Sequence, residues 1–453
     1  MTSFLIRKAV YFLAALALHT TAEALITPIP VPPGTILEGN PLRVEQYIDS
    51  LVVLPGSDLA GAIHHLPLDS EGFIEALDQM HPALLQDITF ATDQNMQAFR
   101  QMLTGRNAFL RHKHCVQFKG LYSDYCNIGP YQFWITPFGV FNNQAHIGDL
   151  HGYRSTTPGI MMGIDSQPNK CTNVGFGLGY SYTDLHWKKA YGNADWHTGY
   201  LGAYASSIYD CFYIDAAVLG SYEFYKTKRK IRYSRLDCLL NDFYCDRLED
   251  CCEEDEDCCA GCHKCLPRQR CHKGFKRKRP CGIHRSARNR YRGYAILSHI
   301  GLGFNFNLCG MQLVPFASID YDFVDQDGHR EYKARSLDLR VKANHAHLLR
   351  TEFGLSAIGC IPYNCGFFRP SATVSFVRRS VLQGEKFKSG FVHYDCQGPY
   401  IARGTGKTLD IVAPGFGLEM QFSSMWIMSF NYEAELCKQR VSQWATCLIK
   451  RTF

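Results

Sequence analysis

Over much of this chain, bulky apolar side chains alternate with small or polar ones with a period of two residues. The alternation is clearest in residues 173–182, 301–308, 415–422 and 426–436, where glycine, asparagine, serine and carboxylates occupy most of the intervening positions. A period of two is that of a β-strand, whose successive side chains point to opposite faces. The sequence therefore predicts an all-β sheet with one apolar face from about residue 131 to the C-terminus.

The composition of the two faces favours a membrane barrel. A soluble β-sandwich would alternate in the same way and stays an alternative. However, the polar face is unusually rich in glycine, and the apolar face carries aromatics near the ends of the segments, as in barrels whose apolar residues face lipid. Aromatic residues make up 13% and charged residues 20% of the chain, and mean hydropathy is -0.18, too polar for a helical membrane protein. The net charge of +6 does not imply a nucleic-acid partner.

The number of alternating segments predicts the topology. Twelve strands satisfy the even number usual for single-chain outer-membrane barrels, with short turns on one side and long loops on the other. Residues 332–344 also look strand-like, but a thirteenth strand would put one terminus on the wrong side, so we assign them to a loop or a strand extension. The predicted strands are 131–141, 157–165, 173–187, 195–208, 211–228, 290–307, 312–324, 347–360, 366–382, 409–422, 425–437 and 442–453.

The N-terminus is typical of an exported protein. Residues 1–24 combine a basic start, a short apolar run and a small-x-small end at Ala22–Ala24, which predicts a cleaved signal peptide. An uncut anchor is the alternative, although a span usually needs about 18 apolar residues. Residues 25–72 contain seven prolines and predict an extended or loosely ordered passenger or linker.

A helix is predicted between this segment and the barrel. In residues 73–106 apolar side chains recur at helical spacing, and Asp69 or Ser70 can cap the start. Pro82 should break or kink this helix, so the better part is 83–104, and Gly105 is a plausible stop. The helix is expected to enter the barrel formed by residues 107–453.

The order of these parts resembles a known family. Ala76–Gln79, Gly177–Ser181, Pro315–Tyr321 and Leu349–Leu355 resemble runs of the autotransporter β-domain, the type V secretion translocator barrel. The barrel is also similar to that of the polymorphic membrane proteins of chlamydia-like bacteria. Over 73–453 this resemblance implies a bacterial outer-membrane barrel with a helix in its pore, with lipid and the barrel assembly machinery as partners. A typical passenger is far longer than residues 25–72.

The last residue, Phe453, resembles the signal that assembly machinery reads on outer-membrane barrels. The final strand would offer its backbone edge for pairing. Arg451 interrupts the alternation that leads to it.

A cysteine-rich segment interrupts the barrel. Ten of the 20 cysteines lie between Cys238 and Cys281, inside a predicted extracellular loop, 229–289. In an exported chain disulfides are the first expectation, within the loop or to other Cys-rich envelope proteins, as in chlamydia-like envelopes. Alternatives are a zinc site at Cys259, Cys262 and Cys265 with His263 and His272, or free thiols. The disulfide candidates are Cys238, Cys245, Cys251, Cys252, Cys258, Cys259, Cys262, Cys265, Cys271 and Cys281.

Charged residues in the lumen are expected to pair, because an unpaired buried charge is costly. We expect at least one arginine of the helix region, Arg100, Arg106 or Arg111, to pair with a lumen carboxylate. Alternatively, Arg106 sits in periplasmic water. The plug-pairing candidates are Arg100, Arg106, Glu352, Glu419 and Glu433, and further inward-facing candidates are Asp215, Glu223, Asp320 and Glu435.

We identify no catalytic residue, cofactor site or metal site outside the zinc alternative, since the histidines are scattered and no Gly-x-Ser-x-Gly elbow occurs. The first hypothesis is a barrel that translocates or displays its N-terminal segment and loops. The second is a structural or adhesive, Cys-crosslinked surface protein that exports nothing. An enzyme in the lumen is a third.

Overall fold

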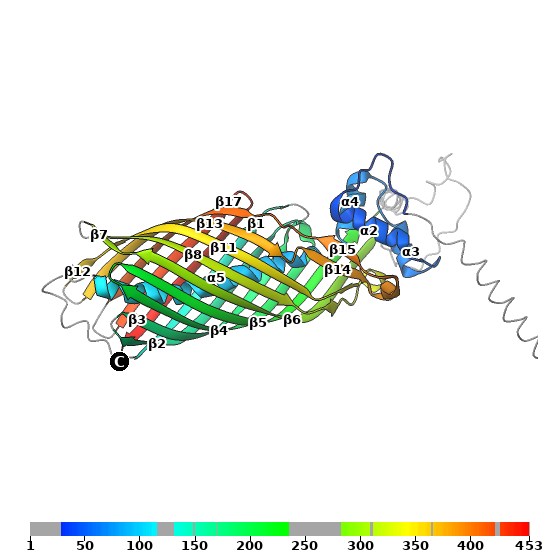
Figure 1. Ribbon diagram of the computed structural model, residues 1–453. Coiled ribbons are helices and arrows are strands. Elements are labelled where there is room, and N and C mark those ends of the chain that lie inside the picture. Colours follow the sequence, from blue (N-terminus) through cyan, green and yellow to red (C-terminus); the bar gives the residue numbers. More distant parts are fainter. Residues whose placement is uncertain are drawn as a thin grey trace, which may run out of the picture.

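The computed structural model describes residues 29–115, 131–147, 150–169, 171–234, 282–308, 311–363, 366–421 and 426–452. Twelve long antiparallel strands in these ranges form a closed barrel around one helix (Figure 1). Each strand pairs with the next, and β18 returns to pair with β1. The predicted fold is confirmed. The strands are β1 (Tyr131–Gln144), β2 (Tyr153–Asn169), β3 (Thr172–Trp187), β4 (Gly192–Tyr209), β5 (Phe212–Tyr233), β6 (Ile283–Phe304), β8 (Met311–Gln326), β11 (Asn344–Gly359), β13 (Gly366–Gln383), β16 (Leu409–Gln421), β17 (Trp426–Cys437) and β18 (Arg440–Thr452).

The two ends of the barrel differ. At the turn end, where β1 begins, neighbouring strands are joined by a few residues, with the short strands β7 (Phe306–Leu308) and β12 (Ile361–Tyr363) extending two of the turns. At the loop end the β5–β6 hairpin is longer than predicted, because its strands run to Tyr233 and resume at Ile283.

Residues 332–344 lie in a loop, as assigned, and contain the short strand β10 (Leu339–Val341). It belongs to a separate four-stranded sheet at the loop end, with β9 (His329–Arg330), β14 (Lys386–Phe391) and β15 (Tyr400–Arg403).

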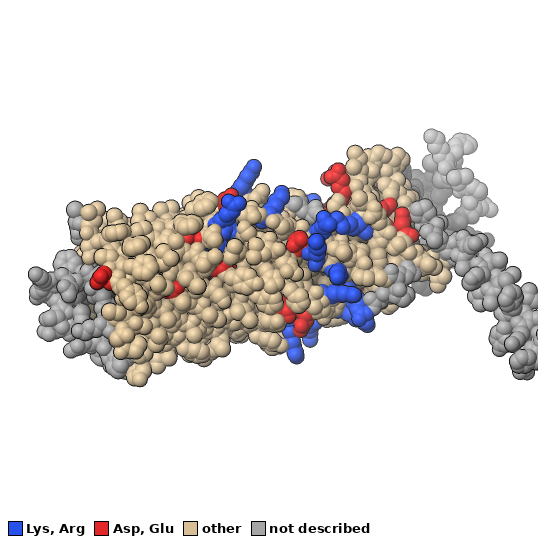
Figure 2. Space-filling view, viewed as in Figure 1, with Lys and Arg blue, Asp and Glu red and all other residues tan. Residues whose placement is uncertain are grey.

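The outer face of the barrel is apolar over most of its length. Figure 2 shows a broad surface with few charges, and Lys and Arg gather toward the loop end. Residues such as Ile160, Leu201 and Ile296 are exposed there, and aromatic residues lie near both ends of the strands. The alternation therefore has the predicted sense, with apolar side chains outward and polar side chains inward. Exposed outer aromatics include Tyr131, Phe133, Tyr209, Phe304 and Trp426 toward the turn end, and Tyr180, Tyr182, Tyr222, Phe224, Tyr294 and Tyr321 toward the loop end.

Glycines on the inner face make room for the central helix, α5 (Leu85–Cys115). A Cβ on Gly202 would lie 2.8 Å from Leu103 Cδ1, and one on Gly179 would lie 3.0 Å from Phe99 Cε2. Because real Cβ atoms rarely approach so closely, Leu103 and Phe99 can take these positions only because Gly202 and Gly179 have no side chain. Other inner-face glycines make room for large side chains of the barrel itself, as Gly163 does for Trp134 and Gly175 for Tyr204.

The predictions for the N-terminal part need two corrections. Residues 25–72 are not extended or loosely ordered where described, because they contain α2 (Gly39–Ser50) and α3 (Asp58–His64), and α4 (Ser70–Asp78) begins there. The prolines are compatible with these helices because Pro41 lies in the first turn of α2, where its missing N–H costs nothing, and Pro55 and Pro67 lie between helices.

The second correction concerns the end of α5. Gly105 does not end the helix, which continues to Cys115. A glycine inside a helix costs only about 1 kcal/mol, and packing inside the barrel outweighs it. Asp69 caps α4 as expected, by accepting a hydrogen bond from Gly72 N, and α5 begins after Pro82. Over the described ranges, no helix combines the length and apolar character of a membrane span.

The close approach of α5 to β4 is testable with two glycines of the same strand. Gly202→Val places methyl groups against Leu103 and Phe99, so we expect overpacking to destabilise the folded barrel by about 1–3 kcal/mol. Gly199 faces outward with open space around it, and Gly199→Val should be tolerated. The measurement is the temperature at which the compact electrophoretic form of each variant unfolds. Equal unfolding temperatures for both variants would contradict the contact.

Candidate functional site: the helix-filled lumen and its cap

The central helix presents two different faces to the barrel. Met96, Phe99 and Leu103 pack among buried apolar residues that include Trp134 and Tyr200, and the Phe99 and Tyr200 rings stack 4.8 Å apart. The opposite face carries Asp93, Gln97, Arg100 and Gln101, all amide or charged side chains. The helix is thus matched to a lumen that is apolar on one side and charged on the other.

Arg350 of β11 is the centre of the charged side. Its Nη1 lies 2.5 Å from Glu352 Oε2 and 3.2 Å from Asp320 Oδ2, and its Nη2 lies 3.2 Å from Glu435 Oε1. Asp320 also lies 2.5 Å from His299 Nδ1, and Ser375 donates to the second oxygen of Glu352. These side chains are almost fully buried, so each charge depends on its neighbours rather than on water.

Helix α5 joins this cluster through Arg100. Its Nε lies 3.4 Å from Asp320 Oδ2, and its Nη2 lies 3.9 Å from Glu352 Oε2. Arg100 Nε also donates to Gln97 Oε1 at 2.9 Å, and Gln97 Nε2 donates to Asp322 Oδ2 at 2.8 Å. One turn of helix therefore meets three carboxylates of β8 and β11.

Two further arginines extend the charged side toward the loop end. Arg379 of β13 pairs with Asp93 of the helix. Arg440 of β18 lies 3.2 Å from Glu435 Oε2, so Glu435 joins Arg350 and Arg440. The helix is thereby held by charges at two levels of the barrel.

The other plug candidates lie around a cavity toward the turn end. Glu433 accepts a hydrogen bond from Gln101 Nε2 at 2.8 Å, and Glu419 lies 3.3 Å from Arg369 Nη1 on the neighbouring strand. These residues, with Arg100 and Glu352, line a cavity of about 330 Å³ beside the helix. Among the described residues, no three His, Cys, Asp or Glu side chains are grouped so as to hold a metal ion.

Several predicted site residues are outside the described part. The side chains of Arg106 and Arg111 are not described, although both lie within the helix. Phe453 and the ten disulfide candidates between Cys238 and Cys281, with His263 and His272 of the zinc alternative, also lie outside the described residues. These predictions stay predictions. The other inward-facing candidates, Asp215 and Glu223, are buried on β5.

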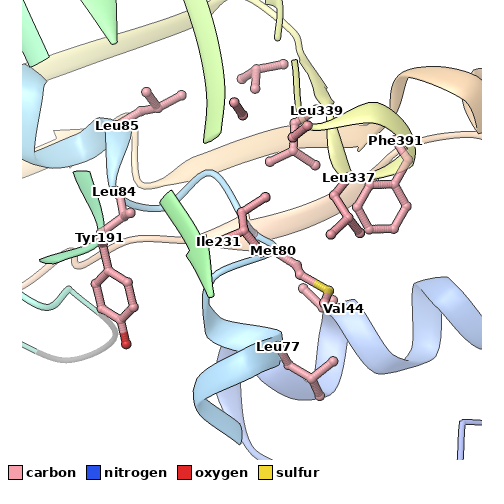
Figure 3. Packing of buried hydrophobic residues seen from close by; sticks show 14 of the residues in the cluster. Val44, Leu77, Met80, Leu84, Leu85, Tyr191, Ile231, Leu337, Leu339 and Phe391 are labelled. Carbon is pink, nitrogen blue, oxygen red and sulfur yellow. The ribbon is translucent and has the colours of Figure 1, made fainter. Parts of the chain in front are cut away.

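The N-terminal helices form a cap on the loop end of the barrel, defined here as residues 29–84. Figure 3 shows Val44, Leu77 and Met80 of the cap packed toward Leu337, Leu339 and Phe391 of the barrel loops. The same buried cluster continues through Tyr191 and Ile231 at the loop ends of the strands. Cap and barrel therefore share one hydrophobic core.

Three amide side chains fasten the cap or the start of α5 to backbone at the loop end of the barrel. Each accepts a hydrogen bond from the N–H of one residue and donates to the carbonyl of that same residue, as a neighbouring strand would. These pairs are Asn40 with Arg403, Gln86 with Thr405, and Gln79 with Arg232. Such side chains satisfy loop edges that would otherwise be buried unpaired.

Two aspartates of the cap form ion pairs with side chains at the loop end of the barrel. Asp58 binds Arg285 through both oxygens, at 2.7 and 2.8 Å, and accepts from Ser336. Burial opposes its charge, but hydrogen bonds from Ser336 and Arg285 outweigh this and lower the pKa of Asp58 to about 2. Asp78 lies 2.7 Å from His81 and 2.5 Å from His151 of the β1–β2 loop. Burial again opposes the charge, and the two histidines hold the pKa of Asp78 below its ordinary value.

Sequence reasoning did not single out the strand arginines Arg350, Arg379 and Arg440. A signal was available for Arg350, because it shares the inner face with Glu352 two residues later. The amide pairs Asn40–Arg403 and Gln86–Thr405 join residues more than 300 positions apart, so local pattern carries no signal for them.

The central place of Arg350 is testable by stability. Arg350→Met leaves Glu352, Asp320 and Glu435 without their shared cation, and breaking a buried pair costs about 3–5 kcal/mol. The matched control is Arg378→Met, which removes an exposed arginine 3.9 Å from Asp410 and should cost under about 1 kcal/mol. Urea unfolding of the two refolded barrels measures the difference. A similar midpoint for both variants would mean that the buried network does not hold the helix.

Residues 133–239 and 275–433 match the family "Autotransporter beta-domain". Among solved structures, the translocator domain of the autotransporter NalP from Neisseria meningitidis matches with a TM-score of 0.51 and 14% identity, covering 80% of this chain and 98% of that one. This likeness shows the fold.

The beta domain of the Bordetella autotransporter BrkA matches with a TM-score of 0.47 and 14% identity, over 72% of this chain and 100% of that one. No curated protein matches the sequence. Because the family match spans more than half of the 453 residues, this outer-membrane translocator-type barrel belongs to the autotransporter beta-domain family.

Proposed function

We propose that this protein inserts in the bacterial outer membrane with its loop end outward and displays residues 29–84 on the cell surface as a folded cap. An N-terminal signal peptide ending near Ala24 would direct its export. The proposal concerns display of a short segment that stays with its barrel, and does not require release of a passenger.

The direction of α5 carries this proposal. Near its start, Asp87 accepts a hydrogen bond from Gln144 at the loop end of β1, and Leu103, farther along, packs against Gly177 and Gly202 of β3 and β4. The chain then begins β1 at the turn end. Residues 29–84 therefore lie beyond the loop end, connected through the lumen, as expected for a segment that crossed the barrel from the turn end.

The contacts of the cap favour display over secretion. A released passenger needs an accessible connection to its barrel. Here His81, Ala83 and Leu84, between α4 and α5, are buried, and the cap shares its core with the barrel loops. Proteolysis of intact cells should therefore nick exposed turns of the cap, while the fragments stay bound until the barrel is denatured.

Orientation and display are tested by inserting one epitope at two sites. Between Pro55 and Gly56 the chain makes an exposed turn of the cap, where a Cβ on Gly56 meets nothing within 4 Å. Between Asp210 and Cys211 it makes an exposed turn at the other end of the barrel. Antibody should label intact cells only for the cap insertion, and both insertions after permeabilisation. Labelling of intact cells at the Asp210 insertion alone would invert the orientation and reject display.

A second function is that of a structural outer-membrane protein crosslinked to the envelope by cysteines. Thiols at the turn end, on the periplasmic side in the orientation proposed above, favour it. Among the described residues neither Cys171 nor Cys211 has a disulfide partner, and both are exposed there; Cys360 is half-buried near the β11–β13 turn. Exposed thiols in an oxidising compartment form disulfides with partners that carry reactive thiols. The partner would be a cysteine-containing envelope protein, as the resemblance to polymorphic membrane proteins of chlamydia-like bacteria suggests.

Non-reducing electrophoresis of membranes, prepared with free thiols blocked, tests this second function. The double variant Cys171→Ser with Cys211→Ser should remove high-molecular-weight species that contain the protein. Cys447→Ser, at a half-buried position on the outer face of β18, should leave them in place. If neither variant changes the species, the turn-end thiols are not crosslinking sites.

A further inference from the structure

The outer face of the β5–β6 hairpin changes character just beyond its aromatic residues. On β5 the outward positions after Phe224 are Lys226, Lys228, Lys230 and Arg232, and all four are at least partly exposed. On β6 they include Arg288, Arg290 and Arg292. The same alternation that presents apolar residues to lipid thus continues as a ladder of cations, which we call the basic ladder.

The pairing register sets like charges opposite one another. Lys226 pairs with Arg290, and Lys228 pairs with Arg288, across neighbouring strands. Like charges directly opposite in a sheet are destabilising. Lys226 lies 3.8 Å from Asp195 of β4, a long and solvent-exposed ion pair that offsets one of these charges in part. The arrangement therefore favours a negatively charged ligand that bridges the two strands.

The cap does not use these cations. Inward-facing arginines of the same hairpin have protein partners, since Arg229 pairs with Glu331 and Arg285 with Asp58. The basic ladder occupies the other face of the strands. Nearby outward positions of the loop sheet are also basic, namely Arg330, Lys386, Lys388 and Arg403.

The height of the basic ladder matches the edge of a membrane. From Phe212 to Phe224 the outer face of β5 is free of charge. These residues span about 40 Å along the strand, or about 30 Å along the barrel axis at a tilt of about 35–45°. Tyr222, Phe224 and Tyr294 mark the upper limit, and Arg292 lies 5.9 Å over the Phe224 ring. The cations begin where lipid head groups are expected.

We propose that the basic ladder binds the phosphate groups of outer-leaflet lipid head groups. The assignment to the outer leaflet rests on the orientation proposed above. A membrane lipid is favoured over a soluble polyanion because the cations continue the lipid-facing side of the same strands, so a lipid anchored beside Tyr222 and Tyr294 presents its phosphates to them without diffusing from solution. Each basic residue near an anionic surface contributes about a fivefold gain in affinity, ~1 kcal/mol.

Binding is tested on the full-length protein in detergent by native mass spectrometry, with bis-phosphorylated lipid A as the probe and its dephosphorylated form as reference. The triple variant Lys228→Gln, Arg288→Gln, Arg290→Gln should bind the phosphorylated lipid about a hundredfold more weakly. The control triple, Arg154→Gln, Lys188→Gln and Arg378→Gln, removes the same charge from positions outside the β5–β6 hairpin and should keep the affinity within about threefold. In lipid-free detergent the test triple should unfold no earlier than the unaltered protein, because it relieves like-charge pairs.

Equal loss in the two triples, or no loss in either, would overturn the proposal. Displacement of the lipid by heparin or by inorganic phosphate at comparable concentration would mean that the face recognises soluble anions, and would also overturn it. Because the measurement is made in detergent, its failure leaves the orientation untouched. If the epitope experiment showed an inverted orientation, the affinity measured in detergent would be unchanged, and the basic ladder would instead face the head groups of the inner leaflet.

Discussion

The structure depends on the burial of the polar face of α5 inside a closed sheet, where charged side chains of the helix meet strand side chains of opposite charge. In a membrane every strand edge must be paired, so the sheet closes and its outer side becomes apolar. The charged side chains then face the inside, across from the apolar packing of Phe99 and Leu103. A bare charge there would be costly, and Arg350, Arg100 and Arg379 meet that requirement by pairing with carboxylates of the strands and the helix. The helix is therefore part of the barrel interior rather than an appendage.

The position of the cap follows from the helix. Because α5 runs through the lumen, the residues before it must lie beyond the loop end, where long connections already form a small sheet. The cap supplies apolar side chains that pack against those of this sheet, such as Leu339 and Phe391. Asp58 and Asp78 then add charge contacts at its edges, and the amide pairs close the loop backbone. The same contacts thus hold the cap in place and cover the loop end of the barrel.

The sequence predicted the barrel well because strand alternation is a local signal. Strand β3, for example, was expected at 173–187 and spans Thr172–Trp187. The ends of β5 and β6 were missed because Lys and Arg replace the apolar residues of their outer face beyond Phe224. The side chains still alternate between the two faces, but apolar residues no longer distinguish the outer face from the inner one. The cap was missed for a different reason. Proline content suggested an extended chain, but Pro41 is harmless in the first turn of a helix, and the helices are stabilised by distant partners such as Phe391 and Tyr400.

In the lumen, the sequence identified Arg100, Glu352, Glu419 and Glu433 as candidates, and the structure places all four around one cavity. Which arginine pairs with which carboxylate depends on the strand register and on the rotation of the helix, and the local sequence pattern predicts neither.

Hydrogen–deuterium exchange of the helix segment 90–104 in the folded barrel tests whether α5 is buried in the lumen. These amides should be protected as strongly as those of β5. Exchange at the rate of a solvated helix, while the strands stay protected, would place the helix in water outside the barrel and contradict the account.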